Sequence, residues 1–171
     1  MNSDSFEDGA NLPVVGITIG DAAGIGPEIS LKAAVDADVA RVCRPVLIGD
    51  LRFLKKNVVD LRLDLDFVEF ESGQNKQVGL IEVIDLENLP ETVVLGLDAA
   101  VTGKASAECI EAAVNLWKRN EIDAIATAPI SKKAISLGGY DFPGHTEFLA
   151  KLTGTQEFAM SFFAEKLRVV L

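Results

Sequence analysis

The chain has 171 residues, of which 49% are hydrophobic and 25% charged, so it can form one compact core and is not an intrinsically disordered protein. Its formal net charge is −10, from 26 acidic and 16 basic side chains, and a field of that sign repels nucleic acids and anionic membranes. A small anionic ligand stays compatible, because a few lysines or a helix N-terminus can bind it locally.

The ends of the chain and its cysteines indicate the compartment. Residues 1–11 are polar and acidic and lack the pattern of a targeting signal, so we expect a disordered leader and a cytoplasmic protein. The longest uncharged run, residues 9–20, is too short to cross a bilayer. Cys43 and Cys109 are too far apart for a CxxC motif, and they are more typical of reduced thiols than of a structural disulfide.

Apolar runs rich in β-branched residues alternate with amphipathic segments along the chain. Strands are predicted at residues 13–19, 45–49, 66–70, 81–84, 122–127, 157–163 and 167–171, with 66–70 at a sheet edge. Helices are predicted at residues 28–35, shortly after Asp50, and at 103–120, 131–137 and 146–152. This alternation predicts an α/β protein: a three-layer α/β/α sandwich around a mostly parallel sheet.

The last five residues are unusual for the end of a domain. Leu167 to Leu171 are predicted to begin a buried strand, and no polar loop follows them. Domain boundaries normally fall in exposed polar linkers. We therefore expect the chain to be truncated.

A glycine-rich loop, Gly-Asp-Ala-Ala-Gly-Ile-Gly-Pro-Glu at residues 20–28, joins a predicted strand to a predicted helix. Its backbone N–H groups could approach an anion closely. Gly26 is followed by Pro27, Glu28 and Ile29, so the third glycine of the dinucleotide fingerprint is absent, and a Rossmann site is disfavoured even though Asp50 could imitate its ribose-binding acid. A ligand-binding loop and a tight turn without a ligand both fit this spacing.

The glycine-rich loop is the first of three clusters suited to binding, and the second and third clusters follow later in the chain. The segment Thr127-Ala-Pro-Ile-Ser-Lys-Lys133 starts where a strand ends, and a lysine there could neutralise a phosphate or simply face solvent. The segment Phe142-Pro-Gly-His-Thr-Glu147 contains the only histidine, His145, at a predicted helix start that favours its neutral form. That imidazole could act as a base, a hydrogen-bond donor or a structural residue. The sequence holds no metal-binding motif of paired histidines.

Three of these segments together resemble the 4-hydroxythreonine-4-phosphate dehydrogenase family. They occur in the order and spacing of that family: Val15 to Ile29, Ala126-Thr-Ala-Pro-Ile-Ser-Lys132 and Pro143-Gly-His-Thr-Glu-Phe148. Weaker likeness extends through residues 46–50 and 158–171, so the resemblance covers nearly the whole chain after residue 12. Ala22 stands where the family usually has proline, which affects the rigidity of the loop but not the assignment.

The resemblance implies an NAD-dependent dehydrogenase of pyridoxal phosphate synthesis. Its substrate would be 4-phosphooxy-L-threonine, whose secondary alcohol is oxidised before the resulting β-keto acid loses carbon dioxide. A divalent metal (Zn, Mg or Co) would polarise the substrate oxygens. The family implies a homodimer with the two-domain fold of the isocitrate and isopropylmalate dehydrogenases, of which residues 12–171 would form an incomplete, N-terminal part.

The resemblance also assigns residue roles. His145 and Thr146 match a substrate-binding His-Thr pair, and Lys132, which matches a lysine of the family's Thr-Ala-Pro-x-x-Lys stretch, is expected to bind substrate as well. It identifies no catalytic or NAD-binding residue in the chain. The metal-binding histidines of the family would lie beyond Leu171, so we expect no metal site within the chain and no activity from these 171 residues alone.

Three alternatives stay open. The substrate could be a related phosphorylated sugar acid, 4-phosphothreonate or 4-phosphoerythronate. The chain could be a non-catalytic remnant that associates through exposed sheet edges. A transferase of acyl phosphates that binds coenzyme A is supported by fold analogy alone.

Overall fold

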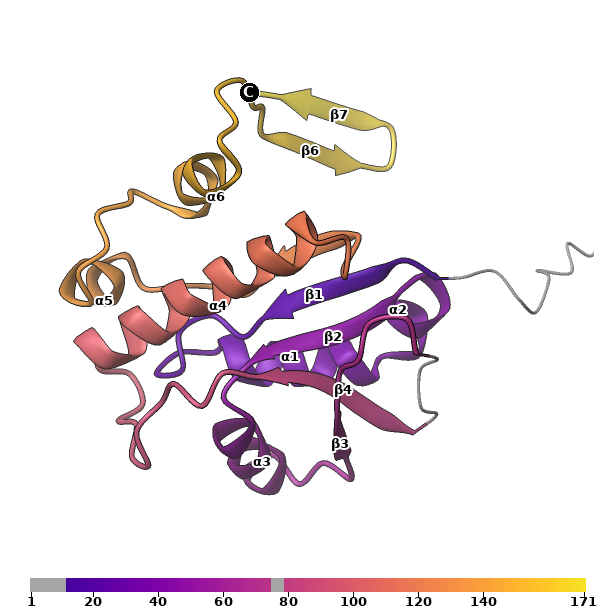
Figure 1. Ribbon diagram of the computed structural model, residues 1–171, viewed down its shortest axis with the longest axis vertical. Helices are drawn as coiled ribbons and strands as arrows, with labels where there is room; N and C mark the ends of the chain where they lie inside the picture. Colours follow the sequence, from indigo (N-terminus) through magenta and orange to yellow (C-terminus); the bar gives the residue numbers. More distant parts are fainter. Residues whose placement is uncertain (1–11, 75–78) are drawn as a thin grey trace, which may run out of the picture.

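A five-stranded parallel sheet forms the centre of the molecule (Figure 1). The computed structural model describes residues 12–74 and 79–171, so the leader expected at residues 1–11 lies outside the described part. The strands are β1 (Val14–Thr18), β2 (Arg44–Gly49), β3 (Asp66–Glu69), β4 (Leu80–Asp85) and β5 (Ala124–Thr127). Their order is β3-β4-β2-β1-β5, and every neighbouring pair is parallel, with β3 at an edge as predicted.

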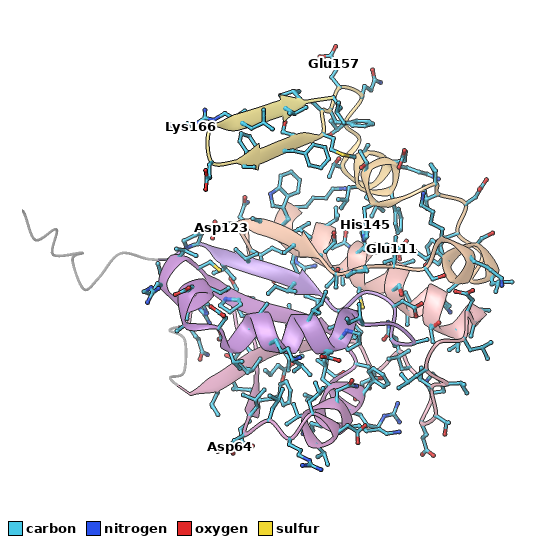
Figure 2. All side chains as sticks on the ribbon, turned by 180° about the vertical axis from the view of Figure 1, so that it is seen from behind. Asp64, Glu111, Asp123, His145, Glu157 and Lys166 are labelled. Atoms are coloured by element: carbon cyan, nitrogen blue, oxygen red, sulfur yellow. The ribbon has the colours of Figure 1, made fainter. Side chains whose placement is uncertain are left out.

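Helices cover both faces of this sheet. They are α1 (Gly26–Val35), α2 (Ala37–Val42), α3 (Leu51–Asp60), α4 (Ala100–Lys118), α5 (Lys132–Leu137) and α6 (His145–Thr153). Figures 1 and 2 show α1 on one face, where it contacts α3, and α4 on the opposite face. The predicted three-layer α/β/α class is confirmed.

The central strands are buried because their residues are apolar almost without interruption. Residues 45–49 of β2 are all buried, and residues 16–18 of β1 are buried beside them. Leu31 of α1, Leu54 of α3 and Ala113 of α4 pack against these strands in one hydrophobic cluster. Strands enclosed in this way are typical of the centre of a parallel sheet.

The six-residue helix α2 was not predicted. It has no buried residue, so it lacks the apolar periodicity from which helices are recognised. Its start is stabilised by Asp36, whose carboxylate accepts hydrogen bonds from the backbone N–H groups of Asp38 and Val39.

The strand predicted at the end of the chain is present, but its predicted burial is wrong. Residues 161–164 and 167–170 form the antiparallel strands β6 (Ser161–Ala164) and β7 (Leu167–Val170), a two-stranded sheet apart from the central one (Figure 1). The side chains of Leu167, Val170 and Leu171 are 64%, 66% and 75% exposed. Their apolar character suggested burial, but burial requires a covering element, and none of the described residues supplies one.

Two further expectations concern the cysteines and the membrane. Cys43 and Cys109 are both free, as predicted. Cys109 lies on the buried face of α4, and burial raises the pKa of its thiol to about 12. Of the helices in the described ranges, none is both long and apolar enough to cross a membrane.

Helices α4 and α5 approach each other so closely that one contact position must be glycine. A Cβ atom on Gly103 of α4 would lie 1.8 Å from the carbonyl oxygen of Ala134 in α5. This contact fixes the position of α5, whose first two residues, Lys132 and Lys133, are the last two of the segment Thr127 to Lys133.

Replacing Gly103 with alanine is therefore expected to lower the free energy of unfolding by about 3 kcal/mol, because one of the two helices must move. Urea denaturation measures the change. Gly24→Ala is the matched control, since its added Cβ would meet nothing nearer than 3.5 Å, and its effect should stay within about 1 kcal/mol. Equal stability of the two variants would contradict the close packing of α4 on α5.

Candidate functional site

The order of the strands points to a particular place on the sheet. From β1 the chain moves through β2 towards β3, whereas β5 lies on the other side of β1. Where the strand order of a parallel sheet reverses, a crevice forms at the carboxyl ends of the strands, and ligands of α/β proteins bind there. The first two predicted clusters follow β1 and β5, so both lie at this position.

Backbone hydrogen bonds join these two clusters directly. The N–H of Asp21 donates to the carbonyl of Pro129 (2.9 Å), and the N–H of Ala128 donates to Thr18 (3.1 Å). Gly20 has a φ of +69°, and a Cβ there would lie 2.3 Å from the carbonyl oxygen of Pro129. Only glycine combines that left-handed conformation with such a close approach.

The glycine-rich loop is a tight turn that leads into α1. The carboxylate of Asp21, only 7% exposed, accepts a hydrogen bond from the N–H of Ala23 (3.0 Å), and the N–H of Gly24 donates to the carbonyl of Asp21 (3.0 Å). Pro27 occupies the first turn of α1, as predicted. The loop thus has the geometry of a strand-to-helix turn, whose backbone alone does not identify a ligand.

Packing of an aromatic side chain holds the third cluster near the first two. Phe148 of α6 is 1% exposed, stacks on Phe142 with ring centroids 4.1 Å apart, and packs against Ala107 and Ile110 of α4. This packing holds the first turn of α6 where that helix meets α4, and Figure 2 shows His145 there. A hydrogen bond between His145 and the backbone of Ala128 connects the third cluster to the second.

The electrostatics of His145 follow from its half-buried position. Its Nε2 atom is buried and has no hydrogen-bond partner among the described residues. Burial lowers the pKa of the imidazole below its ordinary value, and the hydrogen bond with Ala128 opposes that shift more weakly. The side chain is accordingly neutral at neutral pH, and the hydrogen-bonding capacity of Nε2 is unused among the described residues.

The two lysines of the second cluster have different surroundings. Lys132 is exposed, and its Cε lies 4.0 Å from the position that a Cβ on Gly144 would take, next to His145. Lys133 instead pairs with Asp98, with 3.4 Å between Nζ and Oδ2. Thr146 is half-buried in the first turn of α6. The structure therefore brings Lys132 to the helix start that carries His145 and Thr146.

Asp50 does not have the freedom of a ribose-binding acid. Its buried carboxylate accepts hydrogen bonds from the N–H groups of Phe53 (2.8 Å) and Leu89 (3.0 Å), so it caps α3 and fixes a loop. A dinucleotide site, already disfavoured by the missing glycine, therefore also lacks a free ribose-binding acid at Asp50.

Two residues near the site were not predicted. The hydroxyl of Ser106, on the buried face of α4, lies 3.0 Å from the carbonyl oxygen of Gly20 and 2.8 Å from that of Thr102, so its one hydrogen is shared between the glycine-rich loop and its own helix. Asp98 precedes α4 and contacts the start of α5. A buried serine within an apolar helix face was a signal for the first, whereas nothing in the local pattern distinguishes the second.

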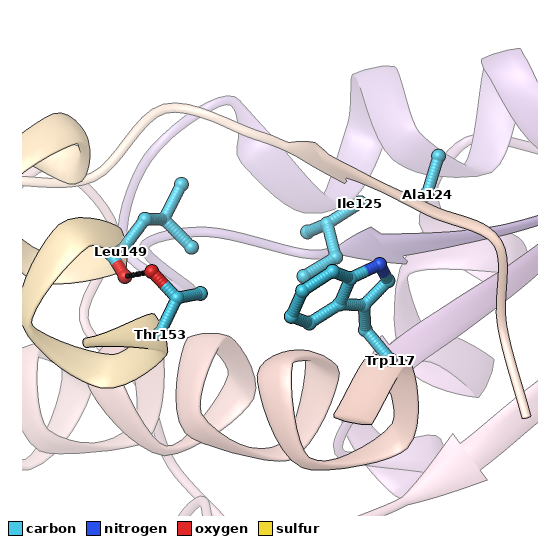
Figure 3. A pocket seen from close by; sticks show the side chains of 5 residues that line it. All are labelled: Trp117, Ala124, Ile125, Leu149 and Thr153. Carbon is cyan, nitrogen blue, oxygen red and sulfur yellow. Dashed lines mark hydrogen bonds between the residues drawn. The ribbon is translucent and has the colours of Figure 1, made fainter. Parts of the chain in front are cut away.

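Two of the cavities in the described part of the chain are lined by residues outside the three clusters. One, of about 370 Å³, is lined by Asp50, Arg52, Asp85 and Glu87. The other, of about 200 Å³, is lined by Trp117, Ala124, Ile125, Leu149 and Thr153 (Figure 3). Trp117, predicted on the apolar face of α4, is 43% exposed at this second cavity. An acidic cavity and an apolar one are both poorly suited to a phosphorylated ligand.

A metal ion would need a group of side chains able to bind it. Within residues 12–74 and 79–171, no three His, Cys, Asp or Glu side chains are grouped so that they could hold a metal ion. The carboxylates nearest the first cavity already accept backbone hydrogen bonds, as Asp85 does from Leu51 (3.0 Å). These residues do not by themselves fit a metal.

Comparison with known proteins gives a consistent set of relatives. Residues 41–171 match the family described as "Pyridoxal phosphate biosynthetic protein PdxA". The D-threonate 4-phosphate dehydrogenase of Cupriavidus necator is 47% identical over 161 residues, which cover 93% of this chain and 48% of that protein. The chain spans about half the length of the curated relatives it matches.

Solved structures agree with these relatives. A 4-hydroxythreonine-4-phosphate dehydrogenase from Burkholderia phymatum superimposes with a TM-score of 0.86 at 40% identity, over 93% of this chain and 49% of that one. The corresponding enzyme of Klebsiella pneumoniae gives a TM-score of 0.85 at 32% identity, over 95% and 50%. All three proteins are dehydrogenases by name, as the family resemblance led us to expect.

The lowered pKa of His145 can be measured directly, because the chain contains one histidine. We expect the imidazole resonances to titrate with a midpoint below 6.5 in the folded protein and near 6.5 in denaturant. The unfolded chain then binds the proton more readily, so this residue makes the free energy of unfolding decrease as the pH falls below 6.5. A folded-state midpoint above 6.5 would show that burial does not dominate.

Proposed function

The chain belongs to the PdxA family of pyridoxal phosphate biosynthetic proteins, and we propose that it provides the substrate-binding half of an NAD-dependent dehydrogenase acting on a phosphorylated hydroxy acid. The observation that carries the proposal is the meeting of the three clusters where the strand order reverses. There the neutral imidazole of His145 has an Nε2 without a partner among the described residues, and the side chain of Lys132 extends towards Gly144, the residue before it. Residues 12–171 would be the N-terminal part of a two-domain enzyme.

Each of these groups has a defined task in binding. Lys132 and the N-terminus of α6 place positive potential where a phosphate or carboxylate would lie. His145 can exchange a hydrogen bond with a substrate oxygen through Nε2, and the hydroxyl of Thr146 lies in the same helical turn. The close contact of Gly20 with Pro129 holds together the backbone segments that follow β1 and β5.

The chemistry itself requires groups that these residues do not hold. When bound, NAD would accept hydride from the secondary alcohol, and a divalent metal would polarise the oxygens of the substrate. The described residues do not fit the metal, so the part of the reaction assigned to this chain is binding and orientation of the substrate. We further propose a cytoplasmic homodimer for the full-length enzyme, as the family resemblance implies.

The names of the relatives affect the choice of substrate. The resemblance of the motifs favours 4-phosphooxy-L-threonine, whereas the curated relatives are D-threonate 4-phosphate dehydrogenases. The two molecules carry the same terminal phosphate and differ by an amino or a hydroxyl group. We propose the shared class, a four-carbon hydroxy acid phosphorylated at C4, and keep D-threonate 4-phosphate as a candidate that the names of the relatives favour.

We expect no NAD-dependent turnover of either phosphorylated acid by the 171 residues alone, because the described residues do not fit the metal. Absorbance of NADH measures turnover, with the Cupriavidus necator relative as the positive control. Sustained turnover by the purified chain, free of contaminating enzyme, would disprove this expectation.

Binding tests the proposed site without requiring catalysis. His145→Ala should weaken binding of D-threonate 4-phosphate about tenfold or more, since a hydrogen bond to a charged ligand is lost. Isothermal titration calorimetry measures the affinity. Lys56→Ala, an exposed substitution on α3 outside the three clusters, is the control and should change the affinity by less than about twofold. Equal affinity of the His145 variant and the parent would refute the site.

A further inference from the structure

The adjacent lysines Lys132 and Lys133 have the same charge, and only Lys132 matches a family motif, but the structure also gives them different partners. The ammonium group of Lys133 lies 3.4 Å from Oδ2 of Asp98. The side chain of Lys132 extends towards Gly144 instead, and in the described part of the chain no ion pair joins it to Glu147, whose carboxylate is also close to Gly144. One lysine is therefore engaged and the other is available.

Asp98 holds more than one group at the start of α5. Its Oδ1 accepts a hydrogen bond from the hydroxyl of Ser131 (2.5 Å), and that hydroxyl oxygen accepts one from the N–H of Ala134 (3.1 Å). The hydrogen bond from Ser131 is the main reason why the pKa of Asp98 is lowered, and Lys133 lowers it further. An ionised carboxylate thus links the segment before α4 to the cap of α5.

The body of α5 is fixed independently of Asp98. Gly103 allows the backbone of α4 to touch Ala134, and a Cβ on Gly138 would lie 2.6 Å from the backbone nitrogen of Lys104. These contacts fix the middle and the end of α5. The cap and the first turn, with its two lysines, additionally contact Asp98 through Ser131 and Lys133.

We propose that Asp98 is a positioning residue for ligand binding: through its hydrogen bond with Ser131, and only weakly through the exposed pair with Lys133, it orients the first turn of α5 so that Lys132 faces the anion at the N-terminus of α6. The inference rests on the proposed function, because it assigns the anion to that site. Asp98 does not touch the ligand. It determines which of two neighbouring cations does.

Removing Asp98 gives a test in which charge and position predict opposite results. Asp98→Ala deletes a negative charge near an anion site, so electrostatics alone predicts tighter binding. Loss of positioning predicts weaker binding, by about fivefold. Asp98→Asn keeps an acceptor for Ser131 and should restore most of the affinity, although it also lacks the charge.

The two lysines supply a charge-matched comparison. Lys132→Ala should weaken binding about tenfold, because it removes the cation that faces the ligand. Lys133→Ala removes the same charge from the neighbouring residue and should change the affinity by less than about twofold. The NMR signal of the single histidine, His145, follows the binding of D-threonate 4-phosphate in each variant, and urea denaturation verifies that each is folded.

The outcomes separate this inference from the proposed function. If the parent chain binds and Asp98→Ala binds equally or more tightly, Asp98 has no positioning role. Equal losses in Lys132→Ala and Lys133→Ala would overturn the assignment of the two lysines. If His145 of the parent chain does not respond to the ligand at all, the proposed site itself is wrong, and the positioning role falls with it.

Discussion

The site depends on one close approach of two backbone segments at the carboxyl edge of the sheet. The N–H of Asp21 reaches the carbonyl of Pro129 only because Gly20 has no side chain and adopts a left-handed conformation. This hydrogen bond joins the segments that follow β1 and β5, which are separated by more than a hundred residues of sequence. Once they are joined, Ala128 is placed to contact His145, so the third cluster lies beside the first two.

Helix α4 is the common support of all three clusters. Ser106 contacts the glycine-rich loop through the carbonyl of Gly20. Gly103 lets the backbone of α5 approach closely, and Ile110 packs against Phe148 of α6. These residues lie within two turns of one helix, so the three contacts share one rigid frame. The geometry of the site is thus determined by a helix that contributes no predicted ligand-binding side chain.

The sequence predicted what is encoded locally. Continuous apolar runs located the buried strands β1 and β2, and Pro27 located the beginning of α1. The same reasoning failed at Leu167 to Leu171, since an apolar run specifies a preference for burial but not the element that satisfies it. Within the candidate site, His145, Thr146 and Lys132 were predicted from motifs, and their roles stay predictions.

The remaining features depend on contacts between distant parts of the chain. Asp98 precedes Ser131 by thirty-three positions and no periodic pattern connects them. Ser106 is recognisable only once its helix is placed beneath Gly20. The motif singled out Lys132 over Lys133, but the different partners of the two lysines emerge from tertiary structure alone.

In a parallel sheet, all strands begin at one edge and end at the opposite edge. The two thiols of the chain lie at different positions in this arrangement. Cys43 directly precedes β2, at the edge opposite the candidate site, whereas Cys109 is enclosed in the core with a pKa of about 12. Cys109 is buried and protonated, whereas Cys43 is only half-buried and can be reached by a reagent. A maleimide linker would therefore tether the protein through Cys43 and leave the carboxyl edge of the sheet facing solution, an orientation suited to ligand binding on a sensor surface.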